Sequence, residues 1–377
     1  MRITGQRPKA VVPAPRTAVE NSAAPQGPVT VWTDADYHLT EATRRALADS
    51  VPEETRRHYE RWWDAAGAFC RVNGRVALPM TPQTLAEFTH ELTKTISDRT
   101  GKLLGGSSLD QAIAAVRAVH TIAGYDGQPV TREARRLIRA HKKHLSTVEG
   151  RTVKRSAIVT PEQAADVVEH IEQEMRAAMT QARAGGGDIV RAALPHLRDR
   201  FLVIGSFLGW TRRSETSAVS IPDVTETAVG LEFLIRSSKT DQEGEGATVH
   251  VRRRDDVLDP VTAWCEYRDA LAACGITTGR VLRRVDRWGN VGDGLSGESI
   301  NDITQRLTEA AGCAYDAKGR KVTSHGWRAS GNSAAKRAGA SGESRREHGR
   351  WAPDSTMPDD VYDRDSVTDP MSAVCLQ

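Results

Sequence analysis

The sequence has no paired cysteines, no long apolar run and no apolar block near its N-terminus. Its five cysteines are scattered and never spaced as C-x-x-C, which favours reduced thiols and argues against a disulfide framework or a metal cluster. The most apolar stretch, FLVIGSFLGW, has ten residues, too few for a membrane helix. The N-terminus also lacks the pattern of a secretory signal. We therefore expect a cytoplasmic protein with no membrane partner.

Charge is distributed unevenly along the chain. The formal net charge of +3 is too small to indicate a partner, but residues 131–155 carry nine Lys or Arg against two Glu. Such a block suits the phosphate backbone of a nucleic acid, although a solvated helix followed by a charged linker explains it equally simply. The candidate DNA-binding residues are Arg135, Arg139, Lys142, Lys143, Arg151, Lys154 and Arg155.

Helical periodicity divides the first part of the chain. Residues 1–48 are rich in Pro, Ala and Thr and predict a flexible arm. Residues 49–148 predict a helical domain of four amphipathic helices. These begin near the Ser50 and Glu53 capping box, at Thr81-Pro82, near Ser107 and near Thr131. A basic linker, 149–157, separates this domain from a second one, 158–377, which ends in a short acidic tail.

The second domain begins with a helix that Thr160 caps, with Gln163 completing a capping box. LRDRFLVIGSFLGW predicts a buried helix. GLEFLIRSSKT and ATVHVRRR predict two strands joined by the Gly-rich turn DQEGEG, and helical patterns return after them. The fold class is therefore mainly α with a small antiparallel β-sheet.

Several polar residues that could take part in catalysis or ligand binding lie at the ends of these elements or on them. Arg212 comes directly after the buried helix, where a guanidinium needs an anionic partner, and Glu215 stands three residues later. Lys239 lies near the tip of the hairpin, and His325 and Arg328 share one face of a helix. Each has a simpler explanation, such as a structural ion pair or a solvated helix face. Their order along the chain is what favours a functional site.

This order resembles that of the tyrosine recombinase, or phage integrase, family over residues 50–365. The family's active site has an Arg, an acid, a hairpin Lys, His-x-x-Arg, a His or Trp, and a nucleophilic Tyr. The matching residues, in that order, are Arg212, Glu215, Lys239, His325, Arg328, Trp351 and Tyr362. Tyr362 follows Trp351 by eleven residues (362 − 351), farther than is usual in the family.

The resemblance implies a SAM-like core-binding domain and an α+β catalytic domain that form a C-shaped clamp on duplex DNA. Tyr362 would attack a phosphodiester whose non-bridging oxygens are held by Arg212 and Arg328, with further donors from His325 and Trp351. Lys239 would protonate the leaving 5′-oxygen. The phosphotyrosine conserves the bond energy, so neither ATP nor another cofactor is expected, and no carboxylate cluster suggests a two-metal nuclease.

The family also implies partners. Recombination at two sites would bring together a homotetramer, with or without a directionality factor, on DNA in the nucleoid. The sequence leaves open whether the role is phage integration, mobile-element transfer or chromosome maintenance. Two alternatives remain: a type IB topoisomerase-like enzyme, and a DNA-binding regulator with impaired catalysis.

Overall fold

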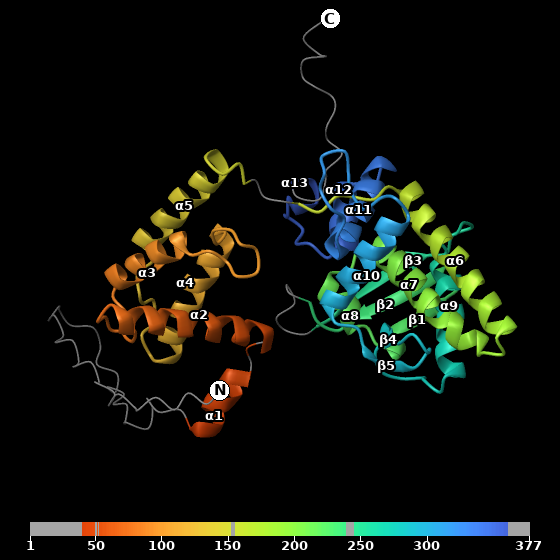
Figure 1. The fold of residues 1–377 in the computed structure, drawn as a ribbon, viewed down its shortest axis with the longest axis horizontal. Coiled ribbons are helices and arrows are strands. Elements are labelled where there is room, and N and C mark those ends of the chain that lie inside the picture. The colour runs from red at the N-terminus through yellow and green to blue at the C-terminus, as the bar shows by residue number, and fades with distance from the viewer. Residues whose placement is uncertain (1–39, 50, 52, 152–154, 239–244, 361–377) are drawn as a thin grey trace, which may run out of the picture. The chain divides into compact units, whose positions relative to one another are not determined.

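The computed structural model describes residues 40–49, 51, 53–151, 155–238 and 245–360. The chain divides into two compact units between Thr152 and Val153 (Figure 1), inside the segment predicted as a linker. Each unit has its own hydrophobic core. Among the described residues, no helix is both long enough and apolar enough to cross a membrane.

The N-terminal unit is built from helices, as the sequence predicts. These are α1 (Glu41–Asp49), α2 (Glu53–Val72), α3 (Pro82–Lys94), α4 (Gly106–Ile122) and α5 (Arg132–Thr147). The start of α3 follows the predicted signal, because the Thr81 hydroxyl accepts a hydrogen bond from the backbone N–H of Thr84 at 3.1 Å. Ser50 of the predicted capping box lies outside the described residues.

Helix α1 lies within the segment 1–48 that the sequence predicts as an arm, so that prediction is wrong for residues 41–48. Its first turn is supported by the Thr40 hydroxyl, which accepts from the backbone N–H of Thr43 at 3.1 Å. Ala, Leu, Glu and Arg dominate the helix and all favour helical backbone. The Pro-rich composition of the preceding residues concealed this local preference.

The core of the N-terminal unit forms from the predicted apolar stripes. In α2, Trp62, Ala66 and Cys70 are buried. They pack in one cluster with side chains such as Leu85 of α3 and Leu109 of α4. Burial of these spaced side chains, rather than helix propensity alone, holds the helices together.

The C-terminal unit combines helices with two small sheets. Its helices are α6 (Pro161–Ala184), α7 (Ile189–Gly209), α8 (Arg213–Ala218), α9 (Pro260–Ala273), α10 (Gly297–Ala310), α11 (Ser324–Arg337), α12 (Gly342–Gly349) and α13 (Met357–Asp360), with a 3₁₀ turn η2 at Ile221–Asp223. The predicted capping box of α6 is confirmed, with Thr160 and Gln163 exchanging bonds of 3.0 and 3.2 Å.

The predicted hairpin is confirmed and has a third strand beside it. The strands are β1 (Val224–Thr227), β2 (Gly230–Ile235) and β3 (Ala247–Arg252), antiparallel in the order β1-β2-β3. Phe233 pairs with Val249 and Leu231 with Val251, so buried side chains recur with the period of two that a half-buried strand requires. Lys239 lies outside the described residues.

A second hairpin, β4 (Arg283–Val285) and β5 (Val291–Gly294), was not predicted, because its strands are short and polar. Helix α7 is the central element of the unit and packs against α6, α9 and α11 (Figure 1). The fold is therefore mainly α with a small antiparallel sheet, as expected, and it brings the end of α7 against α11.

Candidate active site

The site begins where α7 ends. Trp210 follows the helix with φ of +48°, a left-handed conformation that turns the chain sharply. Its indole packs so closely on α11 that a Cβ at Gly331 would lie 2.0 Å from Trp210 Nε1. Gly331 therefore permits this contact, and the turn delivers Arg212 to the N-cap of α8.

Glu215, in the first turn of α8, holds Arg212 in two ways. The backbone N–H of Arg212 donates to Oε2 at 2.8 Å, and its Nη1 donates to Oε1 at 2.6 Å. The predicted orienting contact between these two residues is therefore present. The Arg212 side chain keeps 18% of its surface exposed, whereas that of Glu215 keeps 1%.

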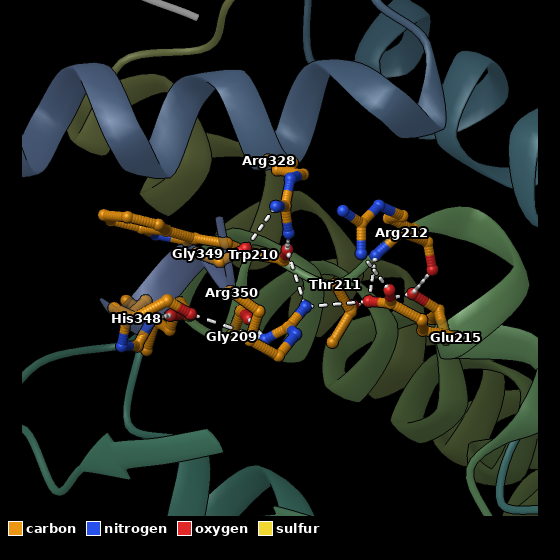
Figure 2. Close-up of polar contacts among 11 residues, drawn as sticks. Gly209, Trp210, Thr211, Arg212, Glu215, Arg328, His348, Gly349 and Arg350 are labelled. Atoms are coloured by element: carbon orange, nitrogen blue, oxygen red, sulfur yellow. Dashed lines mark hydrogen bonds and ion pairs between the residues drawn. The ribbon is translucent and has the colours of Figure 1, made fainter. Parts of the chain in front are cut away.

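The carboxylate of Glu215 also binds a second guanidinium, that of Arg350, whose Nη2 donates to Oε2 at 2.7 Å (Figure 2). Burial alone would raise the pKa of Glu215. The positive charge of Arg350 and the hydrogen bonds from Arg212 outweigh burial, so the pKa lies below its ordinary value. Glu215 is thus a buried anion bridging two cations.

Arg328, in the second turn of α11, is completely buried. Its two terminal nitrogens donate to the backbone carbonyls of Trp210 and Gly349, as Figure 2 shows. Its guanidinium carbon lies 4.2 Å from the centre of the Trp351 ring, a cation–π contact. Arg328 therefore joins the ends of α7 and α12 to α11.

The chain after α12 is shaped for these contacts. Arg350 has φ of +55°, and a Cβ at Gly349 would lie 1.8 Å from Cζ3 of Trp351, so only glycine fits there. Arg350 also donates to the carbonyl of Trp210 at 3.3 Å. The carbonyl of Trp210 thus accepts from Arg328 and from Arg350 together.

His348 supports the same turn from its other side. Its ring contacts that of Trp210 edge-on, with centroids 4.4 Å apart, and its Nε2 bonds to the carbonyl of Leu208 at 2.8 Å. Burial lowers the pKa of His348, and the charges of Arg350 and Arg328 lower it further, against the raising effect of the Leu208 bond. His348 is therefore a neutral donor at pH 7.

The structure brings four of the predicted site residues together: Arg212, Glu215, Arg328 and Trp351. His325 lies three residues before Arg328 in the first turn of α11, with an exposed side chain. Lys239 and Tyr362 lie outside the described residues, so their predicted roles stay predictions.

Sequence reasoning missed Arg350 and His348. The only signal was their position in EHGRW, beside Trp351. Neither a left-handed backbone at Arg350 nor its contact with a carboxylate 135 positions away can be read from local spacing.

The predicted DNA-binding residues fall into two groups. Those of α5, namely Arg135, Arg139, Lys142 and Lys143, are all exposed. Lys142 pairs with Asp110 at 2.8 Å across a half-exposed contact.

Two of the predicted linker residues, Arg151 and Arg155, have partners within the chain. Arg151 donates to the carbonyl of Leu103 at 2.7 Å and lies 3.6 Å from Glu149. Arg155 is exposed and donates to the carbonyl of Asp360 at 3.1 Å. Lys154 lies outside the described residues.

Comparison with solved structures finds DNA-bound recombinases. A lambda integrase tetramer bound to a Holliday junction is 13% identical with a TM-score of 0.49, and the match covers 89% of this chain and 84% of that one. XerH site-specific recombinase bound to a difH substrate is 16% identical with a TM-score of 0.43, and the match covers 78% and 69% of the two chains.

No family model matches the chain. Among curated proteins, the "Integrase/recombinase xerD homolog" of Selenomonas ruminantium is 22% identical over 213 residues, which cover 56% of this chain and 54% of that protein. The chain thus spans about half the length of this curated relative. The relative confirms the resemblance to tyrosine recombinases that the ordered motifs predicted.

Proposed function

We propose that the protein is a site-specific DNA recombinase that cleaves and rejoins duplex DNA through a 3′-phosphotyrosine on Tyr362. The observation that carries the proposal is the cluster in which buried Glu215 bridges Arg212 and Arg350, beside buried Arg328. The order of the site motifs and the curated relative, named as an integrase or recombinase, support it.

The charge of the cluster fits the reaction. Three guanidiniums and one carboxylate carry a net charge of +2 (3 − 1). A phosphodiester carries one negative charge. As a phenolate adds to phosphorus, the negative charge on the non-bridging oxygens rises toward two. A preorganised cation cluster stabilises the crowded, charged transition state more than the ground state.

Arg212 and Arg328, the two arginines that match the family motif, have different surroundings. Arg212 retains exposed surface and is the residue that we assign to direct contact with the phosphate. Arg328 is buried, so a phosphate reaches it only when the groups that cover it move. In the described state, Arg328 orders the turns that present Arg212 and Trp351.

The remaining roles concern proton transfer and further donors. The cationic setting favours loss of the Tyr362 phenol proton to solvent. The phenolate oxygen then forms a bond to phosphorus as the bond from phosphorus to the 5′-oxygen breaks, and Lys239 gives a proton to that leaving oxygen. His325 and the indole N–H of Trp351 donate to non-bridging oxygens. Reversal of these steps with a new 5′-hydroxyl rejoins the strand, so the proposed reaction consumes no ATP and needs no metal.

We further propose that the exposed basic face of α5 contacts DNA phosphates and that four copies assemble on two recombination sites. The C-shaped clamp and a directionality factor stay predictions. A topoisomerase of type IB or a DNA-binding regulator would share parts of the site, but strand exchange between two duplexes distinguishes a recombinase from both.

The test is covalent capture. A nicked half-site, made from the DNA that flanks the gene, releases a short strand after cleavage and traps the adduct. We expect a protein–DNA adduct whose linked peptide contains Tyr362, and none with Tyr362→Phe. An adduct that maps to Tyr315 would overturn the assignment of the nucleophile, and the absence of any adduct on DNA that the protein binds would favour the regulator.

A further inference from the structure

Helix α13 lies in the stretch between Trp351 and Tyr362, where the chain is longer than the recombinase pattern. Two side chains from other helices hold it. Nδ2 of Asn332, in α11, donates to the carbonyl of Pro358 at 2.8 Å. Nη2 of Arg345, in α12, donates to Oδ1 of Asp359 at 2.8 Å.

Both holding side chains are buried polar groups. Asn332 is 0% exposed and Arg345 is 4% exposed. They also contact each other, since Nη1 of Arg345 donates to Oδ1 of Asn332 at 3.4 Å. Burial of an amide and a guanidinium is costly, and apolar side chains of the same volume would stabilise a core at least as well. The presence of these buried polar groups is explained best by specificity, because their hydrogen bonds can be satisfied in only one arrangement of α11, α12 and α13.

Weaker contacts support the same segment. Lys336 lies 3.7 Å from Asp359, and Arg155 donates to the carbonyl of Asp360 at 3.1 Å. Asp359 is about half exposed, so its ion pairs contribute little stability by themselves. The buried hydrogen bond from Asn332 to the carbonyl of Pro358 is therefore the main contact that holds α13. The hydrogen bond from Arg345 to Oδ1 of Asn332 orients the amide that makes it.

We propose that Asn332 and Arg345 are positioning residues for the nucleophile, acting through α13. This inference rests on the proposed function. Tyr362 follows Asp360 by two positions in the sequence, so a displacement of α13 would be transmitted to the nucleophile through at most about 7 Å of chain. An error of about 1 Å at a reacting atom costs roughly 100-fold in rate.

The first experiment measures adduct formation in a single turnover on the nicked half-site, with DNA saturating. We expect Asn332→Ala and Arg345→Met to form adduct about 10- to 100-fold more slowly, with DNA affinity within twofold of the unmodified protein. Arg346→Met, on the same helix but outside the anchor, is the matched control and should keep the unmodified rate. Asp359→Asn, at an exposed position that should not affect folding, should slow the reaction less than Asn332→Ala.

A second experiment separates positioning from damage to the cation cluster. In Tyr362→Phe, hydrogen peroxide serves as an external nucleophile: its oxygen bonds to phosphorus, and the protonated 5′-oxygen leaves. Adding Asn332→Ala or Arg345→Met to this variant should leave the peroxide reaction unchanged, because the anchor acts only through Tyr362. Adding Arg212→Ala should abolish it.

Two results would overturn the inference: an unmodified adduct rate in both anchor variants, or an equal loss of the tyrosine and peroxide reactions. Failure of the proposed function looks different. In that case the unmodified protein forms no adduct at all, and peroxide cleaves nothing in any variant.

Discussion

Glu215 and Arg350 are joined by a buried 2.7 Å ion pair, although 135 positions separate them in the sequence. The pair connects the first turn of α8 to the turn that follows α12. It therefore links the segment that carries Arg212 to the segment that carries Trp351. The geometry of the candidate site depends on this long-range contact as much as on the motif residues themselves.

Arg350→Met should lower the free energy of unfolding by roughly 3 kcal/mol. Breaking a buried ion pair costs ~3–5 kcal/mol, and we expect the lower end of this range because Arg212 still compensates part of the Glu215 charge. Denaturant unfolding measures this change. The double variant Glu215→Gln/Arg350→Met should recover part of the loss, because the buried carboxylate that has lost one of its two cations is then replaced by a neutral amide. Equal stability of the single and double variants would contradict the role of the pair.

Replacing Arg135, Arg139 and Lys143 of α5 together by Gln should weaken binding to every DNA sequence. The slope of log affinity against log salt should flatten by about two to three, because each phosphate contact contributes about 0.9. Arg151→Gln should lower stability, because Arg151 contacts Leu103 and Glu149, and a smaller change in its slope would show whether Arg151 also contacts a phosphate as predicted. An unchanged slope in the triple variant would mean that this face of α5 is only solvated.

Lys239→Ala should slow cleavage by ~100- to 10,000-fold if Lys239 is the general acid. In a substrate with sulfur in place of the bridging 5′-oxygen, the leaving group departs as a thiolate and needs little protonation. This substrate should therefore restore the cleavage rate of Lys239→Ala. Arg212→Ala should stay slow on the same substrate, because the charge it lacks faces the non-bridging oxygens. If sulfur rescues both variants or neither, the two roles are assigned wrongly.

Stability of the N-terminal unit should depend on the protonation of His120. Its Nε2 accepts from the backbone N–H of Met80 at 2.7 Å, so its proton lies on Nδ1, 2.7 Å from the carbonyl of Val116. Burial lowers the pKa of His120, against the raising effect of the Val116 bond. The unfolded state therefore binds a proton at His120 more readily than the folded state does. The contribution of neutral His120 to stability is complete above pH ~6.5 and is lost as the pH falls below that value.

The measurement compares unfolding free energies between pH 7.5 and 5. The unmodified protein should lose more stability over this range than His120→Gln, and His90→Gln, at an exposed site in α3, should follow the unmodified protein. Parallel pH curves for the unmodified protein and His120→Gln would show that His120 does not contribute.

Local signals predicted most helices of this protein. Apolar spacing in α2 and the caps at Thr81 and Thr160 act within one or two turns, so a sequence window contains all the interacting groups. The β2–β3 hairpin followed from alternation around a Gly-rich turn. Helix α1 and the β4–β5 hairpin were missed, since short, polar elements give weak periodic signals.

By itself, the sequence determined which residues form the elements and the order of the motif residues along the chain. Only the tertiary structure decided that Arg350 shares the carboxylate of Glu215, that Arg328 is buried against two backbone carbonyls, and that Asn332 holds α13. The reason is physical. These contacts join distant segments through left-handed turns and close packing at glycine, and their energies depend on burial that no local window contains.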